Sequence, residues 1–228
     1  METASRLARI DSWVFDLDNT LYPASANLFA LIDVRIKAFI AKALNMDLDE
    51  AFILQKKYYI EHGTSLRGLM LNHGVAPDDF LDYVHDIDHS ILAPNPALES
   101  ALGALPGRKL IYTNGSTYHA EQTLLRLGIA AHFSEIFDIR ASSYIPKPDP
   151  GAYAEFVARH VIAPERAAMF EDLPRNLKPA VDLGVTGVWV RHPETRLLPN
   201  EDTSHCHYVT DDLTGWLTDA GKALRSLG

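Results

Sequence analysis

The second half of the chain alternates short apolar segments with longer segments of helical periodicity. The apolar segments predict strands at residues 109–113, 137–141, 167–170, 187–190 and 208–209. The periodic segments predict helices at residues 97–104, 117–127, 150–160, 174–183 and 211–225. Strands that alternate with helices form a parallel sheet covered by helices on both faces. We therefore expect an α/β fold.

An earlier apolar run at residues 13–15 predicts one more buried strand of the same sheet. The region between this strand and residue 97 lacks the alternation. Apolar residues recur there at helical spacing, which predicts helices at 25–45, 48–61, 64–74 and 77–91. We therefore expect a core of residues 1–23 and 96–228 and an all-helical insertion of residues 24–95.

Two aspartates follow the first predicted strand. Asp16 and Asp18 are two positions apart, so an extended chain directs both side chains to one face. Two close carboxylates repel each other and both stay ionised only when a cation or hydrogen-bond donors compensate. Mg²⁺ is the hard, oxygen-seeking cation that suits such a pair. A strand that simply ends in two solvated acids is the equally good alternative for this pair taken alone.

Polar residues also follow the other predicted strands. Thr113 and Asn114 come at the end of one strand, Lys147 lies in a proline-rich loop, and Glu171 and Asp172 end another strand. Each has an ordinary explanation, such as a turn, a surface lysine or an acidic helix start. Ligands of parallel sheets bind at the carboxyl ends of the strands. The joint occurrence of these residues at one edge therefore indicates a functional site.

These residue types suit phosphoryl transfer, which needs in-line attack and compensation of charge on the phosphoryl oxygens. Asp16 is the expected nucleophile and would form an aspartyl-phosphate. Asp18 is placed to protonate the leaving oxygen and then to deprotonate the attacking water. Lys147 brings positive charge to the phosphate and the nucleophile. The Thr113 hydroxyl and the Asn114 amide can donate hydrogen bonds to phosphoryl oxygens.

The same residues predict a magnesium site. We expect Mg²⁺ between Asp16, a backbone carbonyl near Asp18, and Asp172, where it would bridge to the phosphate. Glu171 belongs to the same acidic group. Asn176, one helical turn further on, is expected to contact these ligands without itself binding the metal.

Composition limits the partners and the compartment. The formal net charge of −9 and the lack of a basic run argue against a nucleic-acid polymer as partner. Cys206 is the single cysteine, which favours a reducing compartment. The N-terminal segment lacks the apolar core of a signal peptide, and no apolar run reaches the length of a membrane span. We expect a cytoplasmic protein without a membrane partner, either a monomer or a homodimer.

Together these motifs resemble the haloacid dehalogenase superfamily of phosphatases. Residues 16–20 resemble its first motif, residues 113–115 the second, Lys147 the third, and Glu171-Asp172 with Asn176 the fourth. The resemblance implies a Rossmann-like, doubly wound core, dependence on Mg²⁺ and hydrolysis of phosphomonoesters. It also implies that the insertion is a helical cap of the first type. The dehalogenase branch lacks the second aspartate, so Asp18 favours phosphate chemistry.

Three further segments resemble pyrimidine 5′-nucleotidases, namely residues 18–23, 62–70 and 83–88. This similarity implies a small phosphorylated substrate such as UMP or CMP. Tyr22 is expected to stack on the base, and Arg67 to hydrogen-bond a base carbonyl or the phosphate. Phosphatases of sugar phosphates or of phosphoglycolate, and phosphomutases, remain alternatives. A regulatory protein with a vestigial site is the alternative outside enzymes.

Two histidine clusters have no matching partner motif. His85 and His89 are four residues apart on a predicted helix, a spacing that resembles one face of a zinc site. No third ligand group supports a zinc site, so we expect a polar helix face. The cluster His205-Cys206-His207 is assigned no chemistry.

Overall fold

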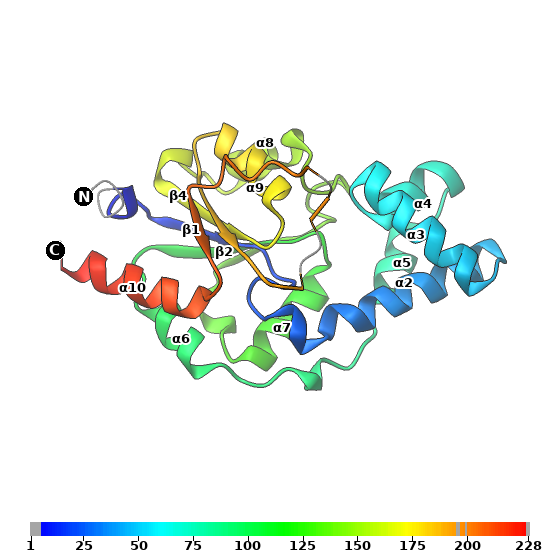
Figure 1. Ribbon diagram of the computed structural model, residues 1–228, viewed down its shortest axis with the longest axis horizontal. Coiled ribbons are helices and arrows are strands. Elements are labelled where there is room, and N and C mark those ends of the chain that lie inside the picture. The colour runs from blue at the N-terminus through cyan, green and yellow to red at the C-terminus, as the bar shows by residue number, and fades with distance from the viewer. Residues whose placement is uncertain (1–5, 195–196, 199, 227–228) are drawn as a thin grey trace.

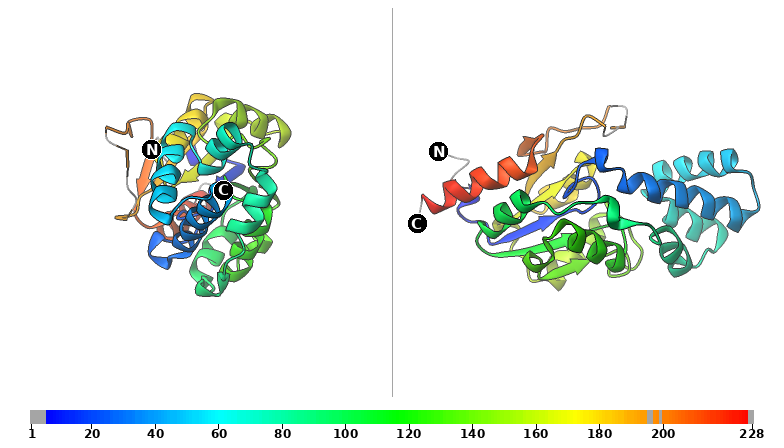
Figure 2. Two further views of the ribbon diagram at one scale, coloured as in Figure 1. Left: turned by 90° about the vertical axis from the view of Figure 1, so that its right-hand side faces the viewer. Right: turned by 90° about the horizontal axis from the view of Figure 1, so that it is seen from below.

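The computed structural model describes residues 6–194, 197–198 and 200–226. The first five residues of the N-terminal segment, for which no signal peptide is expected, lie outside the described residues. Figure 1 shows an α/β core with the helices α2 to α5 gathered at one end. In the right-hand view of Figure 2 these helices lie at the end opposite to both termini.

Among the described residues, six parallel strands form one sheet in the order β3-β2-β1-β4-β5-β6. Their bounds are β1 (Ser12–Phe15), β2 (Arg108–Tyr112), β3 (Glu135–Phe137), β4 (Ala167–Glu171), β5 (Thr186–Val190) and β6 (Tyr208–Thr210). The first strand is central, because β1 pairs with both β2 and β4. All carboxyl ends therefore point to the same edge of the sheet.

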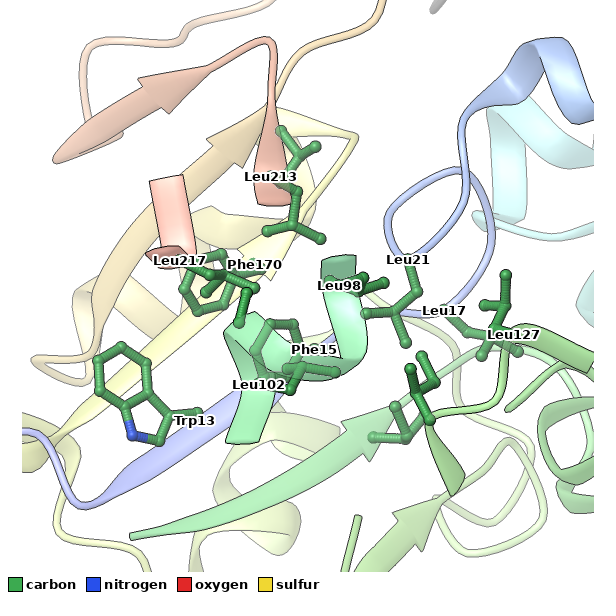
Figure 3. Packing of buried hydrophobic residues seen from close by; sticks show 14 of the residues in the cluster. Trp13, Phe15, Leu17, Leu21, Leu98, Leu102, Leu127, Phe170, Leu213 and Leu217 are labelled. Atoms are coloured by element: carbon green, nitrogen blue, oxygen red, sulfur yellow. The ribbon is translucent and has the colours of Figure 1, made fainter. Parts of the chain in front are cut away.

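Three helices cover one face of the sheet: α6 (Pro96–Gly103), α7 (Thr117–Leu127) and α10 (Leu213–Arg225). Trp13 and Phe15 point to this face because alternate side chains of a strand share a face. The rings of Phe15 and Phe170 stack with centroids 4.6 Å apart. Figure 3 shows these rings among leucines of α6 and α10.

Two helices cover the opposite face: α8 (Pro150–Arg159) and α9 (Pro174–Asp182). Val14, which alternates with Trp13 and Phe15, packs here with Tyr153 and Leu177. Helices on both faces make the core a doubly wound, Rossmann-like α/β fold, as predicted. Short 3₁₀ segments complete the described elements: η1 (Ala24–Ala26), η2 (His89–Ile91), η3 (Ala130–His132) and η4 (Pro164–Arg166).

The helical cap comprises α2 (Leu28–Leu44), α3 (Leu48–His62), α4 (Ser65–His73) and α5 (Pro77–Val84). These helices share an apolar cluster that includes Ile40, Tyr58 and Phe80. Helix α3 begins at a capping box formed by Asp47 and Glu50. These four helices lie between β1 and β2 in the chain.

Three predicted elements differ from the structure. The expected helix 25–45 begins only at Leu28, after η1. The expected helix 77–91 ends at Val84, and the side chain of Asp88 instead caps η2 by accepting from Ser90 N. The expected strand 137–141 lies earlier, at Glu135–Phe137. Asp138 ends it, because its carboxylate accepts the backbone N–H groups of Thr117 and Ala141 and so holds a turn.

Candidate active site

The carboxyl ends of β1 and β4 bring three acidic side chains together. Phe15 pairs with Phe170 across the two strands, and Asp16 N donates to Phe170 O at 2.9 Å. The next residues therefore meet at the sheet edge. Asp16, Glu171 and Asp172 are all buried, and one carboxylate oxygen from each lies within 4.8 Å of the others.

Lys147 supplies a buried positive charge to this group. Its Nζ lies 2.7 Å from Asp16 Oδ1, 2.7 Å from Glu171 Oε1 and 3.0 Å from Tyr112 O. These contacts use all three donors of the ammonium group. Burial alone would lower the pKa of Lys147, but the two carboxylates outweigh it and raise this pKa. Lys147 is therefore a fixed cation.

The site still carries more negative than positive charge. Burial raises the pKa of Asp16 to about 7, with Lys147 opposing and Glu171 adding to the rise. Burial, followed by the charges of Glu171 and Asp16, raises the pKa of Asp172 well above its usual range. Hard oxygen donors with uncompensated charge are the ligand set of a divalent cation. Asp16, Glu171 and Asp172 can therefore hold a metal ion.

The two acids of the Glu171-Asp172 pair differ in their surroundings. Glu171 Oε1 accepts from Asn176 Nδ2 at 2.7 Å, and Oε2 accepts from Leu173 N at 2.9 Å. Glu171 thus contacts both Lys147 and the backbone at the start of α9. Asn176 donates to the same Glu171 oxygen as Lys147 does. The hydrogen bond recorded for Asp172 goes to its backbone oxygen, from Trp189 Nε1 at 3.0 Å. Within the described residues no protein donor is recorded for its carboxylate, which lies beside those of Asp16 and Glu171.

A tight turn follows the first aspartate. Asn19 adopts a left-handed conformation with φ 59°, which asparagine tolerates better than most residues. This turn lets Thr20 Oγ1 donate to Asp16 Oδ2 at 2.9 Å. Both oxygens of Asp16 are therefore held, one by Thr20 and one by Lys147. This contact of Thr20 is not predicted by the pattern of residues 16–20.

The residues after β2 are hydrogen-bonded to the loop that carries Lys147. Asn114 Oδ1 accepts from Lys147 N at 2.9 Å, so the asparagine side chain ties the two segments together. Thr113 Oγ1 accepts from Gly115 N at 2.9 Å, which leaves its hydroxyl hydrogen for another acceptor. Within the described residues no acceptor is recorded for the backbone N–H of Asn114. The predicted phosphate donors are thus available at this edge.

Asp18 lies outside the group of three carboxylates. Its Oδ1 lies 2.7 Å from His119 Nε2 and accepts a hydrogen bond from the Tyr22 hydroxyl. Burial would raise the pKa of Asp18, but His119 and Tyr22 outweigh it, and the net pKa is lowered. Tyr22 is 3% exposed and packs in the core cluster. Its stacking on a base stays a prediction.

The expectation of a polar helix face at His85 and His89 is wrong. Both residues are 5% exposed, and they are not on one helix because α5 ends at Val84. His89 Nε2 lies 3.0 Å from His119 Nδ1, and His85 Nδ1 lies 2.9 Å from Ser116 Oγ. His119, which contacts His89, has one local signal in the sequence. It occupies the first turn of a helix that begins at the site edge.

The second cluster has structural contacts. His205 Nε2 lies 2.7 Å from Pro174 O, and His207 Nδ1 accepts from Gly187 N at 3.1 Å. Burial raises the pKa of the Cys206 thiol to about 11. These contacts anchor the loop before β6.

The cap touches the core beside the site. Tyr59 of α3 accepts a hydrogen bond from Arg175 of α9, and Asp78 of α5 accepts from Arg140 Nε at 2.7 Å. Arg67 lies on the first turn of α4, half-buried, and its guanidinium has no recorded hydrogen bond or ion pair in the described part of the chain. The role of Arg67 stays a prediction.

Every described helix is too short or too polar to cross a membrane.

A family model described as haloacid dehalogenase-like hydrolase matches residues 10–184. Phosphate metabolism protein 8 of Saccharomyces cerevisiae is 31% identical over 189 residues, which cover 75% of this chain and 58% of the yeast protein. Glyceraldehyde 3-phosphate phosphatase of Methanopyrus kandleri is 29% identical over 197 residues, covering 80% of this chain and 84% of that enzyme.

Solved structures share the fold at low sequence identity. CbbY from Rhodobacter sphaeroides in complex with phosphate aligns with a TM-score of 0.66 at 16% identity, covering 95% of this chain and 99% of that chain. L-2-haloacid dehalogenase from Xanthobacter autotrophicus aligns with a TM-score of 0.60 at 16% identity, covering 96% and 100%. At these identities the alignments show a common fold.

Proposed function

The chain belongs to the haloacid dehalogenase-like hydrolase family, and on that premise we propose that it is a Mg²⁺-dependent phosphomonoester hydrolase that forms an aspartyl-phosphate. The observation that carries the proposal is the buried contact of Lys147 with Asp16 and Glu171, with Asp18 two residues beyond Asp16. This arrangement orients a carboxylate for attack and places a second acid nearby.

In the first step, a carboxylate oxygen of Asp16 attacks the phosphorus atom and the bond to the leaving oxygen breaks. Asp18, whose pKa the negative charge of the bound phosphate raises, gives its proton to the leaving oxygen. Lys147 and Thr20 hold Asp16 in place, and the Asn114 N–H and the Thr113 hydroxyl donate to phosphoryl oxygens. Asp16 and Asp172, with Glu171 beside them, would hold Mg²⁺, which would supply positive charge against the charge on those oxygens.

In the second step, water attacks the phosphorus atom of the aspartyl-phosphate. Asp18, now ionised, takes the proton of that water. The bond between phosphorus and Asp16 breaks, and orthophosphate leaves. Asp16 is then a carboxylate again and Asp18 carries the proton needed for the next turnover.

For the substrate, we propose a pyrimidine nucleoside 5′-monophosphate. The support is the resemblance of residues 18–23, 62–70 and 83–88 to pyrimidine 5′-nucleotidases. The relative from Methanopyrus kandleri, named glyceraldehyde 3-phosphate phosphatase, favours a second candidate, a phosphorylated three-carbon compound. In either case the cap, which we place at residues 24–95 between core segments 1–23 and 96–228, would contact the leaving group. Cytoplasmic location and a monomeric or dimeric state remain part of the proposal.

Phosphate release from a panel of substrates tests these proposals. The panel contains UMP, CMP, glyceraldehyde 3-phosphate, phosphoglycolate and a sugar phosphate, each with and without Mg²⁺. We expect the highest kcat/KM for UMP and CMP, no turnover without a divalent cation, and no turnover by Asp16→Asn.

Three outcomes separate the alternatives. Turnover by Asp16→Asn would contradict the nucleophile. A higher kcat/KM for glyceraldehyde 3-phosphate would select the second candidate. Since a phosphomutase passes the phosphoryl group to another substrate, phosphate release without a co-substrate would exclude that alternative.

A further inference from the structure

His119 is fully buried and is held at both ring nitrogens. It is 0% exposed and lies on the first turn of α7. Its Nε2 lies 2.7 Å from Asp18 Oδ1, and its Nδ1 lies 3.0 Å from His89 Nε2. Rotation of the ring would break both contacts. The position of Nε2 against Asp18 is therefore defined by the fold.

The ring is also clamped by its neighbours. The rings of His85 and His119 stack with centroids 4.7 Å apart and planes 9° apart. His85 is held in turn by Ser116, which also caps α7. His85 and His89 belong to the segment that returns from the cap to the core. The contact between His119 and Asp18 thus rests on two separate parts of the chain.

The contacts of Asp18 are confined to one of its two oxygens. The Tyr22 hydroxyl and His119 Nε2 both contact Oδ1. Among the described residues, no hydrogen bond is recorded to Oδ2. The side chain of Asp18 is 16% exposed, whereas that of His119 is fully enclosed. Asp18 therefore has one anchored oxygen and one oxygen available to a bound molecule.

We propose that His119 is a positioning residue that anchors Oδ1 of Asp18 and thereby presents Oδ2 to the leaving oxygen and to the attacking water. This inference rests on the proposed phosphatase function. The terminal torsion of an aspartate has a broad energy profile, so an unanchored carboxylate would turn freely. General acid catalysis needs the carboxyl oxygen within hydrogen-bond reach of the leaving oxygen. His119 removes this freedom.

The first test compares two substrates that differ in their need for a general acid. One is the best alkyl phosphate of the panel above, and the other is 4-nitrophenyl phosphate, whose phenolate leaves with little protonation. Because kcat/KM covers steps up to the phosphorylation of Asp16, it reports on leaving-group departure. The ratio of the two kcat/KM values does not depend on how much of a variant is folded.

Two amide variants separate the two contacts of the ring. The amide of His119→Gln reaches the position of Nε2 and keeps a donor to Asp18. The amide of His119→Asn occupies the position of Nδ1 and reaches only His89. We expect His119→Asn to lower kcat/KM about 100-fold for the alkyl phosphate and less than about 5-fold for 4-nitrophenyl phosphate. His119→Gln should restore the ratio to within about 5-fold of wild type.

A matched control and a double variant complete the design. His132, whose ring lies beside Glu99 away from the site, takes the same change. His132→Asn should leave both kcat/KM values unchanged. In an Asp18→Asn background, His119→Asn should lower kcat/KM for the alkyl phosphate by no more than about 3-fold, because the group that it positions is already gone.

The outcomes distinguish the inference from the function on which it rests. Equal losses on both substrates in His119→Asn, or a full additional loss in the Asp18→Asn background, would overturn the positioning role while leaving the phosphatase proposal intact. Failure of the wild-type protein to hydrolyse either substrate would overturn the proposed function itself. A selective loss on the alkyl phosphate that His119→Gln restores would support the inference.

Discussion

Lys147 Nζ lies 2.7 Å from Asp16 Oδ1, although 131 residues separate them in the sequence. The lysine is buried, and the same nitrogen lies 2.7 Å from Glu171 Oε1. A buried charge pair that loses one partner leaves the other uncompensated. This relationship therefore has consequences for stability as well as for catalysis.

Lys147→Met should destabilise the protein strongly. The change keeps an unbranched side chain, one atom shorter than that of lysine, but leaves Asp16 and Glu171 buried without a cation. We expect the free energy of unfolding to fall by about 3–5 kcal/mol in urea titrations with EDTA present. The control is Lys178→Met, which removes an exposed ion pair with Asp182 and should cost less than about 1 kcal/mol. Equal effects of the two changes would contradict the prediction.

Magnesium should stabilise the folded protein through the three carboxylates. At a Mg²⁺ concentration 100-fold above its dissociation constant, the free energy of unfolding should rise by about 2.7 kcal/mol. EDTA should reverse the rise. Asp172→Asn should abolish it, whereas Asp219→Asn, at an exposed carboxylate of α10, should preserve it. An unchanged urea midpoint of the wild type in Mg²⁺ would rule out this metal site.

His85 should weaken the protein in acid. Burial, followed by the charge of His119, lowers the pKa of His85 to about 3, and the other charged neighbours are Asp18, His89 and Arg140. In the unfolded chain a histidine binds a proton at about pH 6.5. Between about pH 6.5 and about pH 3 the unfolded state therefore binds the extra proton. The free energy of unfolding should fall by up to about 1.4 kcal/mol per pH unit as pH decreases through this range.

His85→Gln should remove this contribution. Urea titrations of wild type and variant at a series of pH values measure it. Their difference in free energy of unfolding should be constant above about pH 7.5, where His85 is neutral in both states, and should shift in favour of the variant as pH falls. Parallel curves over the whole range would show that His85 does not titrate differently on unfolding.

Gly68→Ala should disrupt the cap. A Cβ atom at this position of α4 would lie 2.3 Å from Tyr58 Cγ, so the two helices would have to separate. We expect a loss of about 1–3 kcal/mol in the free energy of unfolding. At Gly103 the added Cβ would lie 3.3 Å from the His132 ring, a side chain that can shift. Gly103→Ala should therefore change stability by less than about 1 kcal/mol, and equal losses would contradict the packing argument.

The fold and much of the candidate site could be predicted because their signals are local. Alternating apolar segments indicated the parallel sheet, and residues that directly follow strands meet at one edge. Asp16, Glu171 and Asp172 could be predicted as site residues in this way, since each lies at or just after the end of a strand. Lys147 could be predicted as a site residue from its position in a proline-rich loop.

The rest depends on contacts between distant segments. His119 and Asp18 are 101 residues apart, and no local pattern relates them. His85 and His89 match a helical spacing, but α5 ends at Val84, before both of them. Both rings pack against His119 of α7, so tertiary packing decides their burial. The early end of β3 is likewise decided by Asp138, whose side chain bonds a backbone group 21 residues away.

The insertion of the cap after the first strand also determines the order in which segments of the chain can fold during synthesis. Ser12 of β1 pairs with Arg108, 96 residues later, and with Ala167. The cap helices pack mainly on their sequence neighbours, and contacts close in sequence form faster than distant ones. As synthesis proceeds from the N-terminus, the cap is complete before β1 has any partner. A nascent chain that stops before residue 167 therefore contains all of α2 to α5 but lacks Glu171 and Asp172, two of the three acidic side chains of the candidate site.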